Sequence, residues 1–102
     1  MDRDKCEIDP RKIQTVRNCL EKQFVDIKFS PNIRPTFSFK NVDRKLSWLL
    51  VINVEFLTDH MPLEELQQFI EEKVLKKVHA NPGKRIQISK YRDITVEEKN
   101  LP

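Results

Sequence analysis

Apolar residues recur at every third or fourth position near the start of the chain, which is the period of a helix with one buried side. The stripe consists of Ile13, Val16, Leu20 and Phe24. Asp9 and Pro10 precede it, and this pair favours a helix start because aspartate accepts a hydrogen bond from a free backbone amide and proline has the φ of a first turn. The pattern therefore predicts a helix from about residue 10 to 24.

The period then changes to two, which is typical of strands with one buried face. Residues 25–29 and 36–40 show this alternation, although 25–29 could also continue the first helix. The longest such segment is 46–57, in which every even position is apolar: Leu46, Trp48, Leu50, Ile52, Val54 and Phe56. Because its odd positions are mixed, we expect a long central strand with one face in the core and the other partly covered.

A second helix follows, with Thr58 or Asp59 as its cap and Pro62 in its first turn. Its buried stripe is Leu63, Leu66, Ile70, Val74 and Val78. The sequence Asn-Pro-Gly at 81–83 ends the helix in a type II turn, which needs a positive φ at Gly83.

A last strand, with Ile86 and Ile88 facing the core, completes the order α-β-β-β-α-β, or α-β-β-α-β if residues 25–29 belong to the first helix. These elements predict an α+β fold, a two-layer sandwich with two helices packed on one face of a three- or four-stranded antiparallel or mixed sheet. The last two strands, joined through the second helix, could be parallel neighbours.

The domain is expected to span residues 9–93, between a flexible N-terminal tail at 1–8 and a charged C-terminal tail at 94–102. Ile94 and Val96 in that tail could extend the strand pairing. With 102 residues, 38% of them hydrophobic and 34% charged, the chain has the composition of one globular domain.

The longest apolar run is residues 48–52, far shorter than the roughly 20 residues that cross a bilayer. The charged N-terminus has no apolar signal segment. We therefore expect a cytoplasmic protein without membrane contact, in which Cys6 and Cys19 are free thiols.

Signatures of catalysis and of cofactor binding are missing from the sequence. The chain has one glycine, whereas a loop that cradles phosphate needs several. His60 and His79 stand at opposite ends of the second predicted helix, too far apart to hold a metal together, and nothing in the predicted fold brings a histidine to either cysteine. We expect a protein that is not an enzyme and that has no catalytic residues, metal site or cofactor.

Charge is segregated along the chain although the net charge is only +3. Residues 55–72 hold six acidic side chains and no Lys or Arg, and residues 73–92 hold seven Lys and Arg and no acidic residue. The helix dipole favours this order within a helix, and charges on a terminal strand guard against edge pairing, so part of the pattern has a purely structural cause. Further cations that could lie beside the basic segment across the sheet are Arg34, Lys40, Arg44 and Lys45.

The leading hypothesis is a small binding domain that contacts an acidic partner through a basic surface at the end of the second helix and on the last strand. The candidate nucleic-acid-binding residues are Lys76, Lys77, Lys84, Arg85, Lys90 and Arg92. We expect them to share one exposed face. RNA or DNA is slightly favoured over protein because each neutralised phosphate releases counterions, although Tyr91 is the only obvious stacking residue in the segment.

The alternative is a protein-interaction or regulatory module, which could be a homodimer formed through an edge strand or through the odd face of strand 46–57. Leu49, Val51 and Leu57 would then lie in the interface. No motif in the chain identifies a family.

Overall fold

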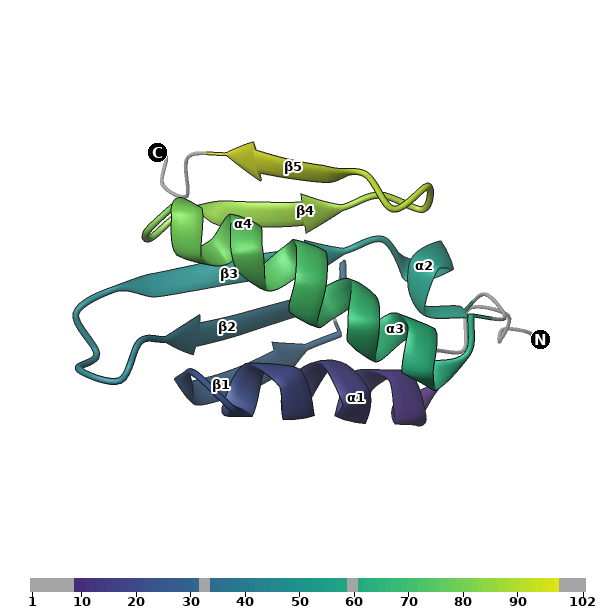
Figure 1. Cartoon of the computed structure of the whole chain (residues 1–102), viewed down its shortest axis with the longest axis horizontal. Helices are drawn as coiled ribbons and strands as arrows, with labels where there is room; N and C mark the ends of the chain where they lie inside the picture. The colour runs from purple at the N-terminus through teal and green to yellow at the C-terminus, as the bar shows by residue number, and fades with distance from the viewer. Residues whose placement is uncertain (1–8, 32–33, 59–60, 98–102) are drawn as a thin grey trace.

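The computed structural model describes residues 9–31, 34–58 and 61–97 and has an α+β fold (Figure 1). Its helices are α1 (Pro10–Glu21), α2 (Val54–Thr58), α3 (Leu63–Phe69), the π-helical η1 (Ile70–Val74) and α4 (Leu75–Ala80). Its strands are β1 (Val25–Ser30), β2 (Thr36–Lys40), β3 (Ser47–Ile52), β4 (Arg85–Ile88) and β5 (Ile94–Glu97).

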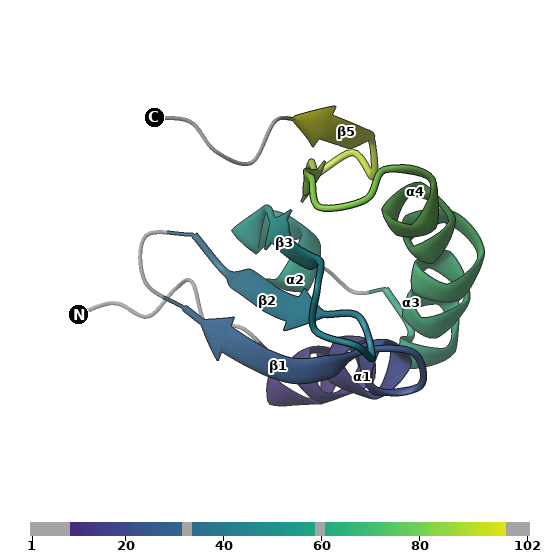
Figure 2. The same ribbon diagram turned by 90° about the vertical axis from the view of Figure 1, so that its left-hand side faces the viewer.

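The strands form one mixed sheet in the order β1-β2-β3-β4-β5. All neighbours are antiparallel except β3 and β4, which are parallel and are joined through the helices. Helix α1 and the continuous rod of α3, η1 and α4 lie on one face of this sheet (Figure 2). The predicted α+β class and the parallel pair are therefore confirmed, but the sheet has five strands rather than three or four, and α2 was not predicted.

Helix α1 begins as the sequence predicts. The Asp9 carboxylate accepts a hydrogen bond from the Arg11 amide at 2.9 Å, and Pro10 is the first helical residue. The helix ends at Glu21 instead of residue 24. The amides of Gln23 and Phe24 both donate to the Leu20 carbonyl, at 3.1 and 2.9 Å, and this shared acceptor closes the last turn before β1 begins. Residues 25–30 are a separate strand, which settles the alternative that the sequence left open.

The long strand predicted at 46–57 is wrong at both ends: Leu46, expected in the core, precedes β3 and is 39% exposed, and the strand stops at Ile52. The side chain of Asn53 accepts a hydrogen bond from the Glu55 amide at 2.8 Å, and this local bond starts α2 where the alternation of apolar residues suggested more strand. Leu57 is fully buried in α2. The homodimer alternative required Leu57 to lie on an open sheet face, and the structure places it in the core instead.

The helical rod of α3, η1 and α4 buries a stripe in which each residue follows the last by four positions. The stripe is Leu66, Ile70, Val74 and Val78, each with no exposed surface. Four residues of an α-helix turn through about 400°, so such a stripe drifts by about 40° per step. The wider turn of η1 offsets this drift and keeps all four side chains against the sheet.

The two ends of the rod match the sequence-based predictions in part. Pro62, expected in the first turn, stands at the N-cap of α3 without a side-chain hydrogen bond. Of the two predicted caps, Thr58 is the last residue of α2 and Asp59 lies outside the described residues. Gly83 has a φ of 72°, as the predicted type II turn requires. None of the described helices is long and apolar enough to cross a membrane.

Strand β5 lies in the segment that the sequence assigned to a charged C-terminal tail. Ile94 and Val96 do extend the pairing, opposite β4. The hydroxyl of Ser89 accepts hydrogen bonds from the amides of Tyr91 and Asp93, both at 3.1 Å, and closes the turn between the two strands. Residues 1–8, the predicted N-terminal tail, lie outside the described part of the chain.

The core lies between the helices and the inward side of the sheet. The buried side chains that the central strands contribute include Phe37, Phe39, Leu50, Ile86 and Ile88. Because side chains alternate along a strand, the residues between them point to the opposite side. We call that side the open face, because no described helix covers it (Figure 2).

Candidate functional site

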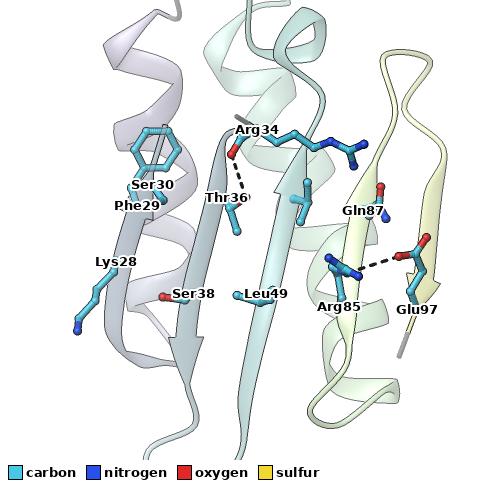
Figure 3. Close-up of a pocket in the computed structure, with 11 residues that line it drawn as sticks. Lys28, Phe29, Ser30, Arg34, Thr36, Ser38, Leu49, Arg85, Gln87 and Glu97 are labelled. Carbon is cyan, nitrogen blue, oxygen red and sulfur yellow. Dashed lines mark hydrogen bonds and ion pairs between the residues drawn. The ribbon is translucent and has the colours of Figure 1, made fainter. Parts of the chain in front are cut away.

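The open face carries a hollow of about 790 Å³ (Figure 3). Leu49 and Val51 of β3 form an apolar floor. The flanking strands contribute hydroxyl and amide side chains, namely those of Ser30, Thr36, Ser38 and Gln87. The alternation that sends Phe37 and Phe39 into the core is what places Thr36 and Ser38 on this face.

Three cations and one carboxylate line the hollow. They are Lys28 on β1, Arg34 just before β2, Arg85 on β4 and Glu97 on β5. The side chain of Arg34 extends from the start of β2 across β3 toward Gln87, while Lys28 stands at the margin of the sheet (Figure 3). Within the described ranges, no carboxylate lies within ion-pair distance of Lys28 or Arg34. The hollow therefore has an excess of positive charge.

Arg85 and Glu97 form a loose ion pair inside the hollow. The Arg85 Nε atom lies 3.4 Å from Glu97 Oε1, which is longer than the roughly 2.7–2.9 Å of a charge-assisted hydrogen bond. This Nε atom is buried and has no hydrogen-bond partner among the described residues. The Arg85 side chain as a whole is 37% exposed. The side chain is thus partly open to solvent, while its buried Nε–H group is incompletely bonded.

A second hollow of about 350 Å³ continues the first toward the carboxyl ends of β3 and β4. Arg34, Val51 and Gln87 line both hollows. We call the two hollows, which share these three lining residues, the trough. Arg34 stands where the two hollows meet, so an extended molecule that fills the trough would pass its guanidinium group.

The six cations that the sequence singled out do not share one face. Arg85 is the one that lines the trough. Lys76 and Lys77 are exposed on α4, in the helix layer on the other side of the sheet (Figure 1). Lys84 is half-buried in the turn that precedes β4.

The two cations after β4 lie near carboxylates of α2 and α3. The Lys90 Nζ atom lies 3.3 Å from Glu55 Oε1 of α2. The Arg92 Nη1 atom lies 2.9 Å from Glu65 Oε2 of α3. Both acidic partners come from the segment just before the basic one, so the charge segregation seen in the sequence is partly cancelled in the fold.

Sequence reasoning named Arg34 only as a possible neighbour of the basic segment, and it missed Lys28. Arg34 does lie across the sheet from Arg85, whereas Arg44 is paired with Asp26 at 2.9 Å. The alternation in β1 was the available signal for Lys28, because it places this residue opposite the buried face. The neighbours of β1 in the sheet could not be read from that alternation.

Cysteine thiols and clusters of metal ligands are two kinds of group that could support catalysis. Burial raises the pKa of the Cys19 thiol to about 11, and the nearby Glu71 carboxylate adds to the shift, so the thiol stays protonated and unreactive near neutral pH. No group of three metal-ligating His, Cys, Asp or Glu residues occurs in the ranges that the structure describes. Cys6 and His60 lie outside those ranges.

A scan against protein-family models, a search of curated proteins and a search of solved structures each found no match to this chain. A functional proposal therefore rests on the geometry and charge of the trough.

Proposed function

We propose that this protein is a non-enzymatic binding domain that holds single-stranded nucleic acid along the open face of its sheet. The observation that carries the proposal is the trough, in which Lys28, Arg34 and Arg85 outnumber the single carboxylate of Glu97. Cations at the margins of such a groove neutralise phosphates and release counterions, while an apolar floor takes up the bases.

A hollowed sheet face suits a single strand better than a duplex. Base edges of duplex DNA are read by a helix or a two-stranded ribbon that enters the major groove, and the helices of this protein lie on the other side of the sheet. Bases of a single strand can lie against Leu49 and Val51, and the planar guanidinium group of Arg34 can stack on a base. Wall side chains such as Gln87 can hydrogen-bond to base edges.

We expect binding to be modest in strength and mainly electrostatic. Phe29 is the one aromatic residue among those lining the described trough, and its ring packs against Phe37 with the centroids 4.8 Å apart. An aromatic platform would add roughly 1–3 kcal/mol for each stacked base. Without it, affinity depends on the phosphate contacts.

Affinity for a short single-stranded oligonucleotide should therefore fall steeply with salt. Three phosphate contacts give a slope of about −2 for the logarithm of the association constant against that of the salt concentration, or roughly twentyfold weaker binding at 200 mM than at 50 mM. Fluorescence anisotropy of labelled mixed-sequence RNA and DNA measures this slope. Absence of binding at low salt, or tighter binding of an acidic peptide of equal charge, would reject nucleic acid as the partner.

The second candidate is a protein partner, including a second copy of this chain. The observation that favours it is the apolar floor, since Leu49 and Val51 lie on the odd face of β3. Against self-pairing, an isologous contact would bring the same three cations toward their copies, and Val51 is only 7% exposed. Sedimentation velocity separates the cases: we expect a monomer, and a dimer that dissociates on Leu49→Glu would support the alternative.

A further inference from the structure

We infer that Glu97 occupies, in the free protein, the place at Arg85 that an anionic group of the ligand takes in the complex. The inference rests on the proposed function and adds a regulatory element to it. Glu97 would act as an internal competitor that keeps weakly bound anions out of the trough.

The strand register builds this contact. Arg85 of β4 and Glu97 of β5 are direct partners across the antiparallel pair, so their side chains emerge next to each other on the open face. β5 is the edge strand of the sheet. The carboxylate therefore reaches the trough from its rim and can turn away without disturbing the core.

The contact between Arg85 and Glu97 is long and incomplete, so a ligand group with better geometry could replace it. Its 3.4 Å separation exceeds the 2.9 Å between Arg92 and Glu65 in the helix layer. The buried Nε atom of Arg85 is left without a hydrogen bond among the described residues. A phosphate has several strong acceptor oxygens and can meet two donors of the guanidinium fork at once, which a single carboxylate oxygen at 3.4 Å does not do.

Two effects of Glu97 oppose ligand binding. It holds the Arg85 side chain, and its charge repels an incoming phosphate. Exposed charge pairs of this kind are weak and are screened by salt, so the expected effect is moderate: Glu97→Gln should bind the same oligonucleotide roughly fivefold more tightly at low salt. The advantage should shrink as salt is added.

The matched control is Glu65→Gln, which removes the same charge and frees another arginine, Arg92, outside the trough. Its affinity should stay within twofold of wild type. If wild type binds and Glu97→Gln binds no better than Glu65→Gln, the inference is overturned while the proposed function stands. If neither wild type nor Glu97→Gln binds at low salt, the proposed function fails and the inference fails with it.

An NMR readout in the full-length chain does not depend on the affinity of a variant. The Nε–Hε resonance of Arg85 should move when oligonucleotide is added to wild type, because the Glu97 contact is replaced. The Arg92 Nε–Hε resonance should stay in place. An Arg85 resonance that does not respond to saturating oligonucleotide would show that Glu97 remains in contact, and would overturn the inference.

Discussion

The double variant Lys28→Glu with Arg34→Glu should bind single-stranded oligonucleotide about a hundredfold more weakly than wild type at low salt. Each reversal removes one phosphate contact and adds one repulsion, for which we expect roughly a tenfold loss per position. Both side chains are on exposed residues without a carboxylate partner in the described part of the chain, so the fold should be retained. Fluorescence anisotropy at low salt measures the loss, and circular dichroism checks the fold.

The matched control is Lys76→Glu with Lys77→Glu, which changes the net charge by the same amount on the helix layer. When both double variants are compared at about 0.15 M salt, we expect it to remain within about threefold of wild type, because electrostatic attraction beyond the Debye length of about 8 Å is then largely screened. The role of Lys76 and Lys77 that the sequence suggested stays a prediction, and this variant tests it. Loss of binding in the helix-layer variant alone would move the site away from the trough.

Leu50→Ala should destabilise the protein by about 3 kcal/mol, a large part of the 5–15 kcal/mol typical of a domain. Leu50 is fully buried in β3, the central strand of the sheet, so the substitution leaves a cavity between the sheet and the helices. The next residue, Leu49, is half-buried on the open face and gives a control with the same chemical change. Leu49→Ala should cost about 1 kcal/mol or less.

Urea unfolding followed by tryptophan fluorescence measures both losses, since Trp48 is buried in the same strand. The difference between the two losses of unfolding free energy reports which face of β3 is covered. Equal losses would contradict the assignment of an open face.

Much of the fold could be predicted from local patterns, because local physics and tertiary packing agree there. Asp9 caps a helix whatever it packs against, and Gly83 adopts a φ that other residues avoid. Prediction failed at Asn53, where apolar Val54 and Phe56 fit a strand but the side chain of Asn53 favoured a helix start. The existence of β5 also stayed undecided, because two alternating apolar residues, Ile94 and Val96, do not identify a strand unless the pairing with β4 is known.

The candidate site was harder to predict, because residues close in the sequence need not be close in the fold. Lys77 and Arg85 are separated by a single turn, yet one lies on the outside of the helix layer and the other on the opposite face of the sheet. Lys28 and Arg34 flank the connection between β1 and β2, and the strand order places β4 with Arg85 on the same sheet face although it lies about fifty residues later in the chain. Glu97 was assigned to a tail, so its pairing with Arg85 could not be foreseen.

The most direct test of the binding face is an NMR titration of the full-length chain with a short single-stranded oligonucleotide. We expect the largest amide shift changes at Ser38, Leu49, Val51 and Gln87, which line the trough, with small changes along α4. Changes concentrated at Lys76 and Lys77, or no changes at low salt, would contradict binding on the open face.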